Sequence, residues 1–166
     1  LGLAFDAEGR SSEAREAFLQ ARQCGNLGAE LMAMVEPKVT SDVVTSMLNG
    51  YDQTGLLPKW ASNNGESYVM VGDPAAGIIA DAYAFGARSF DTDKALAALQ
   101  HEATAPNNDR PGEAVRDAKG YLPLDEKDYG CCNFYGPVST QLEYDSADYA
   151  PAALATSLGK KAVYQQ

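Results

Sequence analysis

Apolar and polar positions follow a helical period over most of this chain. Apolar side chains recur at three- and four-residue spacing in four stretches, which are 11–23, 41–55, 73–86 and 91–99. A fifth helix is predicted from about Ser139, and Pro151 predicts that this helix is kinked or divided in two. Alternation with a period of two is almost absent. The stretch that shows it, 68–71, is too short to form a sheet. The pattern predicts an all-α fold.

Residues that favour helix ends support this assignment. Asp73 followed by Pro74 is typical of a helix start, with the aspartate as cap and the proline in the first turn. Ser41 is the predicted cap of an earlier helix, and Gly55 is its predicted C-terminal stop. Asp91 is predicted to begin the helix that follows.

Two connections between the predicted helices are unusually long. The first spans 56–72, and the second spans 105–137, which is rich in Pro, Asn, Asp and Gly. Loops of this length in a compact domain tend to carry function. No change in composition marks a linker within the chain.

Charge narrows the classes of partner. The chain has 13 Lys plus Arg against 23 Asp plus Glu, a formal net charge of −10, which argues against a nucleic-acid partner. The sequence contains no run of 18 apolar residues, so no membrane-spanning helix is predicted. A single histidine and three cysteines argue against a zinc site. Neutral or cationic ligands, or another metal, remain open.

The 56–75 stretch combines side chains that suit a sugar. It brings an indole (Trp60), amides including Asn64 and the carboxylates Glu66 and Asp73 to one loop and the helix start after it. Sugars need an apolar platform for their C–H faces and fixed polar groups for their hydroxyls. For Trp60 the alternative is a core anchor, and for Asp73 it is a helix cap alone. Glu66 is the strongest candidate for a ligand contact.

Several motifs, in this order, resemble the catalytic domain of glycoside hydrolase family 92, the calcium-dependent inverting α-mannosidases. They are LLPKW, NGE, MVGDPAAGIIADAYAFGARSFD, GYLP at 120–123 and VSTQLEYDSADYAPAALATSLGK. The resemblance implies consecutive helices of an incomplete (α/α)6 toroid. It also implies exo-hydrolysis of terminal α-mannosyl linkages in glycans, assisted by Ca²⁺, and a secreted, periplasmic or cell-surface location.

Glu143, in the Leu-Glu-Tyr motif, is the candidate catalytic residue. Inverting hydrolysis needs one carboxyl group to protonate the leaving oxygen and another to activate water. For Glu143 an acid role, a role in ordering the sugar pocket and a purely structural role all remain open. Asp145 and Asp148 could chelate a cation at their helical spacing, although such acidic faces are usually only solvated.

The resemblance covers residues 32–166, while 1–31 form a helical N-terminal segment of unclear match. Later family motifs are absent, so the calcium ligands, still unknown, and at least one catalytic carboxylate are expected outside this chain. The remainder of the catalytic domain and a β-sandwich domain are the expected protein partners, and the isolated chain is expected to be inactive. Two alternatives are a non-catalytic carbohydrate-binding relative and a helical-repeat interaction module, which the tetratricopeptide-like spacing of 1–21 suggests.

Overall fold

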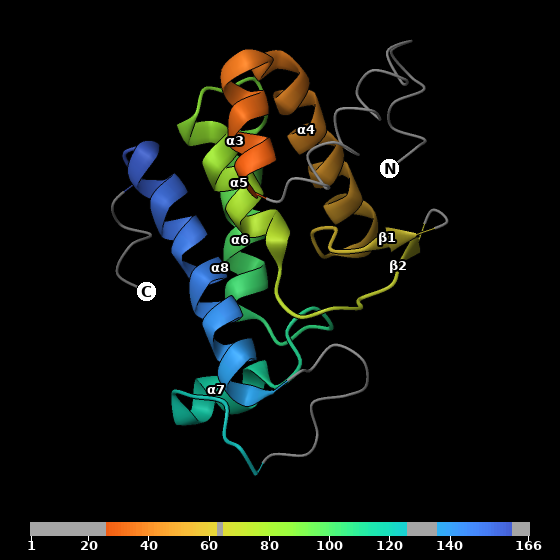
Figure 1. Ribbon diagram of the computed structural model, residues 1–166, viewed down its shortest axis with the longest axis vertical. Coiled ribbons are helices and arrows are strands. Elements are labelled where there is room, and N and C mark those ends of the chain that lie inside the picture. Colours follow the sequence, from red (N-terminus) through yellow and green to blue (C-terminus); the bar gives the residue numbers. More distant parts are fainter. Residues whose placement is uncertain (1–25, 63–64, 126–135, 161–166) are drawn as a thin grey trace.

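The computed structural model describes residues 26–62, 65–125 and 136–160. Within these ranges the chain is mostly helical, and two-residue strands form one small hairpin (Figure 1). The helices are α3 (Asn26–Val35), α4 (Pro37–Thr54), α5 (Pro74–Ala84), α6 (Thr92–Thr104), α7 (Glu113–Lys119) and α8 (Pro137–Ser157). The strands β1 (Ala61–Ser62) and β2 (Gly65–Glu66) pair antiparallel. The all-α prediction is confirmed.

Helix α5 is the centre of the packing. It contacts α3, α4 and α8, while α6 packs on α4 and α8. Figure 1 shows α5 and α6 between α8 on one side and α4 on the other. Alanines such as Ala75, Ala76 and Ala82 are buried on α5, and their small side chains let the neighbouring helices approach closely. The main core is built from these alanines and from aliphatic side chains such as Ile79 and Leu99.

The predicted helix ends are confirmed at three places. Helix α5 begins at Pro74 directly after Asp73. The Asp91 side chain accepts a hydrogen bond from the Lys94 N–H (2.9 Å) at the start of α6. Gly55 ends α4 in a left-handed conformation with φ +81°. These ends depend on neighbours in sequence, which is why the sequence alone could predict them.

The predicted start of α4 is wrong. This helix begins at Pro37, so Ser41 lies inside it rather than at its cap. The Ser41 hydroxyl donates to the Pro37 carbonyl (2.7 Å) and accepts from the Ser89 N–H (3.1 Å). A proline in the first turn provides the stronger start signal here, since its fixed φ suits that turn and it has no N–H to leave unpaired.

Pro151 does not divide the last helix, because α8 continues through it as one element. Its buried face, which includes Tyr144, Ala147, Ala150 and Leu154, packs against α5 and α6. This packing keeps the helix continuous despite the N–H that proline lacks. No helix in the described part of the chain combines the length and hydropathy needed to cross a membrane.

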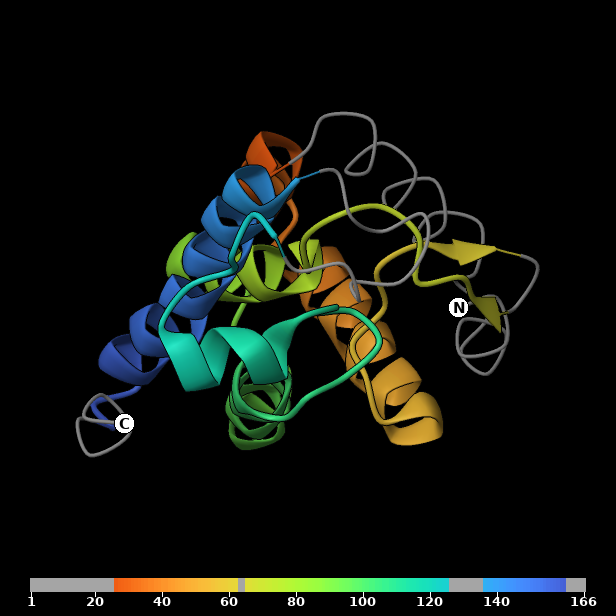
Figure 2. The same cartoon turned by 90° about the horizontal axis from the view of Figure 1, so that it is seen from below.

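The long connections contain structure that the periodicity did not predict. The hairpin β1–β2 lies in the first connection, and α7 lies in the second. Figure 2 shows α7 beside α6 and α8. Gly112 and Gly120 flank α7, both with positive φ, and such short helices bounded by glycines have little apolar period to detect. The predicted helix 11–23 and the tetratricopeptide-like segment lie outside the described residues.

Candidate functional site

The loop before α5 is held together by the carboxylate of Glu66. Its two oxygens accept from four backbone N–H groups, those of Lys59, Trp60, Ser67 and Tyr68, at distances of 2.7 to 3.1 Å. Hydrogen bonds from N–H groups to an ionised carboxylate are stronger than those between neutral groups. Glu66 therefore fixes the two sides of the β1–β2 hairpin to each other.

This arrangement leaves the indole of Trp60 at the surface. Trp60 is 41% exposed, so it is not a core anchor. Its N–H is bound by Glu66 and its carbonyl accepts from the Ser67 hydroxyl (2.8 Å), which fixes the backbone that carries the ring. An exposed aromatic ring on a fixed backbone is suited to contact a sugar face. Asn64, the other predicted residue of this loop, lies outside the described residues.

Asp73 is buried and does not cap its helix. Its side chain makes no hydrogen bond to the first turn of α5. Instead, Oδ2 accepts from Arg110 Nε (3.2 Å) and Nη2 (2.8 Å). Burial raises the pKa of Asp73 above its ordinary value, while the Arg110 guanidinium opposes that rise. Asp73 therefore links the start of α5 to the 105–112 segment.

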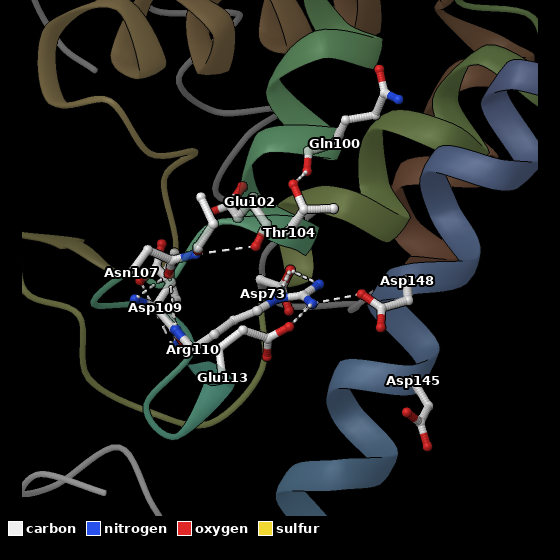
Figure 3. A network of polar contacts seen from close by, with 12 residues as sticks. Asp73, Gln100, Glu102, Thr104, Asn107, Asp109, Arg110, Glu113, Asp145 and Asp148 are labelled. Atoms are coloured by element: carbon white, nitrogen blue, oxygen red, sulfur yellow. Dashed lines mark hydrogen bonds and ion pairs between the residues drawn. The ribbon is translucent and has the colours of Figure 1, made fainter. Parts of the chain in front are cut away.

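Arg110 also reaches α7 and α8 (Figure 3). Its Nη1 lies 2.5 Å from Asp148 Oδ1 and 3.5 Å from Glu113 Oε1. Burial alone would lower the pKa of Arg110, but the carboxylates of Asp73 and Asp148 raise it above its ordinary value, so the group stays charged. Its guanidinium also lies over the ring of Tyr144, 5.3 Å from the centroid.

A second arginine completes this network. Arg116 on α7 binds Glu113 Oε1 (3.0 Å), Asp145 Oδ1 (2.9 Å) and Asp148 Oδ2 (2.5 Å). Burial raises the pKa of Glu113, and the two arginines oppose that rise. Asp148 is therefore neither simply solvated nor a free metal ligand, since each of its oxygens binds one arginine.

Glu143, the predicted catalytic residue, differs from these paired carboxylates. It is exposed on α8, and among the described residues its carboxylate has no hydrogen-bond or ion-pair partner. It contacts Gly72, the residue before Asp73, so closely that a Cβ on that glycine would lie 2.8 Å from Glu143 Oε2. The structure thus brings Glu143 next to the end of the loop that carries Trp60.

A second buried cluster lies beneath this loop. Glu102 and Asp109 are each 1% exposed, and none of their four carboxyl oxygens has a hydrogen-bond partner among the described residues. Lys59 extends to this pair, with Nζ 2.9 Å from the Asp109 carbonyl oxygen and 3.9 Å from Asp109 Oδ1. Burial, together with the neighbouring carboxyl group of Asp109, raises the pKa of Glu102 to about 9. Burial lowers the pKa of Lys59 and raises that of Asp109 to about 6.

The described side chains include no cluster of the kind that usually holds a metal ion. In ranges 26–62, 65–125 and 136–160, no group of three or more His, Cys, Asp or Glu side chains could hold a metal ion. The carboxylates around Arg110 and Arg116 bind these arginines, and Glu66 binds backbone N–H groups. The carboxyl groups of Glu102 and Asp109 are buried.

Sequence reasoning missed the residues that organise this region. Arg110, Arg116, Glu102 and Asp109 were not predicted, and three of them lie in the connection interpreted as a long loop. The available signal was the run Asn107 to Gly112, in which an arginine stands between turn-forming residues. The Asn107 side chain does organise this turn, because its Oδ1 accepts from the Asp109 N–H (2.8 Å).

Comparison with known proteins identifies the family. The family model of the glycosyl hydrolase family 92 catalytic domain matches residues 28–166. A family GH92 inverting mannosidase from Bacteroides thetaiotaomicron superposes with a TM-score of 0.72 and 30% sequence identity, over 84% of this chain and 18% of that one. A family GH92 α-mannosidase from the same species, solved with mannoimidazole, gives a TM-score of 0.69 and 28% identity, over 82% of this chain and 17% of that one.

This chain spans less than a fifth of the length of those two structures. A search of curated proteins gives no match. The family model matches most of the chain, and the structural similarity points to the same family. The chain belongs to glycosyl hydrolase family 92, the glycoside hydrolase family that its motifs indicated.

Proposed function

We propose that this chain is part of an exo-acting α-mannosidase that hydrolyses terminal α-mannosyl linkages of glycans with inversion and with the help of calcium. Membership of the family and similarity to two mannosidase structures support this proposal. The proposed partners are mannose-containing glycans, the remainder of the catalytic domain and a β-sandwich domain. The proposed location is secreted, periplasmic or at the cell surface.

The observation that carries the proposal is the state of Glu143. Asp73, Glu113, Asp145 and Asp148 all bind arginines, so their charges are already neutralised. Glu143 is exposed beside them, and within the described ranges its carboxylate binds no other group. A group that gives a proton to a leaving oxygen must be within hydrogen-bond reach of substrate, and Glu143 meets that requirement better than its paired neighbours.

In this proposal, the neighbouring residues contribute to sugar binding in two ways. Trp60 contacts the substrate with its exposed ring. Glu66 and Asp73 act less directly: Glu66 fixes the loop that carries Trp60, and Asp73 fixes the start of α5. Glu143 acts as the general acid, and the carboxylate that activates water comes from outside the described residues. Inversion places these two carboxyl groups about 6.5–9.5 Å apart, with room for the water.

Calcium remains part of the proposal on the strength of the family resemblance. Its ligands would come from outside the described residues, because no group of three or more metal-ligating side chains lies within them. No step performed by this chain's own residues depends on the ion. When bound, it would contact sugar hydroxyls through hard oxygen coordination.

The test uses the full-length product of the reading frame that encodes this chain. We expect it to hydrolyse α-1,2-mannobiose and to release β-mannose first, as followed by proton NMR of the anomeric signals. We expect Glu143→Gln to lower the rate by about 10²- to 10⁴-fold, the usual contribution of a general acid. Glu36→Gln, an exposed glutamate before α4, is the matched control. Absence of hydrolysis, release of α-mannose first, or an unchanged rate in Glu143→Gln would refute the proposal.

A further inference from the structure

Lys59 and Trp60 are neighbours in the first connection, but their side chains lie in opposite environments. The Lys59 side chain is 2% exposed, whereas Trp60 is 41% exposed. Leu57, two residues before Lys59, is 1% exposed and belongs to the main core. Burying an ammonium group costs free energy unless polar groups bind it. Burial lowers the pKa of Lys59 for this reason, and neighbouring carboxylates such as that of Asp109 oppose the shift.

The buried ammonium makes its shortest contact with the backbone rather than with a carboxylate. Nζ donates to the carbonyl oxygen of Asp109 at 2.9 Å, while Asp109 Oδ1 lies 3.9 Å away, beyond hydrogen-bond distance. If Lys59 only neutralised the buried pair of Glu102 and Asp109, we would expect its shortest contact to be with a carboxyl oxygen. The hydrogen bond to a carbonyl instead fixes the distance between the loop and the 105–112 segment.

The turn that presents this carbonyl is itself held in place (Figure 3). The Asn107 side chain accepts from the N–H groups of Asp109 (2.8 Å) and Arg110 (3.0 Å) through Oδ1. It also donates through Nδ2 to the carbonyl oxygen of Glu102 (3.1 Å), in the last turn of α6. Arg110, the next residue along the chain, binds Asp73 at the start of α5. Lys59 therefore binds a point that is attached to both α5 and α6.

The backbone of Lys59 is held by the hairpin. Its N–H donates to Glu66 Oε2 (2.7 Å), and the next N–H, that of Trp60, donates to Glu66 Oε1 (2.8 Å). These two bonds join the loop to itself, because they span seven and six residues. The Lys59 side chain, in contrast, spans 50 residues to reach Asp109. Glu66 thus sets the shape of the loop, while Lys59 sets where this loop stands on the helices.

We propose that Lys59 is a positioning residue for Trp60: its ammonium, bound to the Asp109 carbonyl, fixes the place at which the exposed indole ring meets the sugar. This inference rests on the part of the proposed function in which Trp60 contacts the substrate, and it does not involve Glu143. Lys59 itself contacts no substrate atom in this proposal, because its side chain is buried.

The chemistry of an aromatic contact provides a specific readout. A ring that lies against a sugar face binds the substrate and the transition state alike, so its displacement raises KM and leaves kcat unchanged. A purely structural role for Lys59 has a different effect. Loss of stability lowers the fraction of folded enzyme, which lowers the apparent kcat and leaves the KM of the folded molecules as it was.

The experiment measures kcat and KM for α-1,2-mannobiose in the full-length product of the reading frame, at about pH 5.5. Lys59→Met keeps the apolar stem and removes the ammonium. This pH lies below the pKa values of about 6 for Asp109 and about 9 for Glu102, so the pair can stay neutral without Lys59. We expect KM to rise about fivefold to tenfold, the order of one aromatic contact, with kcat within about twofold. Lys38→Met, at an exposed lysine on α4, is the matched control and should leave KM unchanged.

A double-mutant cycle tests whether Lys59 acts through Trp60. Trp60→Ala should raise KM at least as much as Lys59→Met does, and the double variant should show no further rise, because residues that act as a unit are not additive. A further rise in the double variant, or a folded Lys59→Met in which kcat falls at unchanged KM, would overturn the positioning proposal and leave the sugar contact of Trp60 intact. If Trp60→Ala leaves KM unchanged, that contact fails and the positioning proposal fails with it.

Equilibrium binding separates this proposal from the proposed hydrolysis. The dissociation constant of mannose, measured by calorimetry for the same variants, should rise in parallel with KM. Mannose binding without turnover in the unmodified product would refute the proposed hydrolysis. A weaker affinity in Lys59→Met would still support the positioning role in that case, and an unchanged affinity would overturn it.

A second variant covers the case in which Lys59→Met does not fold. Asn107→Ala leaves Lys59 in place and loosens the turn that presents the Asp109 carbonyl. We expect a smaller rise in KM at unchanged kcat, with a circular dichroism spectrum like that of the unmodified protein. An unchanged KM in this folded variant would contradict the proposal by an independent route.

Discussion

The buried pair of Glu102 and Asp109 makes the stability of this chain depend on pH in a defined direction. Burial and the neighbouring carboxyl group of Asp109 raise the pKa of Glu102 from 4.5 to about 9. Between these two pH values the folded chain keeps a proton that the unfolded chain releases. The free energy of unfolding therefore falls as pH rises through that window.

The size of the effect follows from the number of protons. One proton held only by the folded state changes the free energy of unfolding by about 1.4 kcal/mol per pH unit. Between pH 6 and pH 8 this amounts to about 3 kcal/mol, a large part of the 5–15 kcal/mol that is typical of a domain. Glu102→Gln keeps the shape of the side chain and removes the ionisable group. Between pH 6 and pH 8 the unmodified chain should lose about 3 kcal/mol of unfolding free energy that the variant does not lose.

The assay is urea-induced unfolding at several pH values between 6 and 8. Trp60 is the single tryptophan and lies next to Lys59, which contacts the pair, so its fluorescence is a suitable signal. Other buried carboxylates such as Asp73 contribute slopes of the same sign, and these cancel in the comparison of the two chains. Glu36→Gln reports what the loss of one exposed charge does by itself. Parallel stability curves for Glu102→Gln and the unmodified chain would refute the reasoning.

Four further predictions concern the network, the loop and the isolated chain. Arg110→Ala should lower the free energy of unfolding by about 3–5 kcal/mol because it leaves buried carboxylates unpaired, and adding Asp73→Asn should restore part of that loss in denaturant titrations. Tyr144→Phe removes a hydroxyl that donates to a backbone carbonyl and should cost about 1 kcal/mol; an unchanged midpoint of thermal unfolding would contradict this. Glu66→Gln should speed hydrogen exchange at the Trp60 amide, measured by mass spectrometry or NMR, because the charged acceptor is lost. The 166-residue chain alone should not hydrolyse α-1,2-mannobiose, and turnover comparable to that of the full-length product would contradict the view that it is part of a larger enzyme.

Much of the secondary structure could be predicted because its signals are local. Asp73 and Pro74 mark the start of α5 through the conformations they prefer, and Gly55 ends α4 because it adopts a left-handed conformation at low cost. The same kind of local reasoning allowed Pro151 to divide the last helix, which it does not do. Proline does disfavour a helix interior, but packing of the buried face of α8 on α5 and α6 outweighs that preference.

The candidate site, like the secondary structure, could be predicted only in part from the sequence. The motifs in the sequence identified the family and singled out Trp60, Glu66, Asp73 and Glu143 as chemically interesting. They did not distinguish the carboxylates from one another, since an aspartate beside a helix start is the same in sequence whether it caps, binds an arginine or contacts a sugar. Only the fold shows that Glu66 binds backbone N–H groups, that Asp73 binds an arginine and that Glu143 is exposed.

The sequence by itself therefore determined the helical class, several helix ends, the family and a set of candidate residues. The tertiary structure decided which of those residues are paired and which are available. The physical reason is distance along the chain, which no local pattern encodes: Arg110 meets Asp73 and Asp148 across 37 and 38 residues, and Gly72 meets Glu143 across 71 residues. Burial, charge pairing and proton affinity all depend on such contacts, so they exist only once the helices have packed.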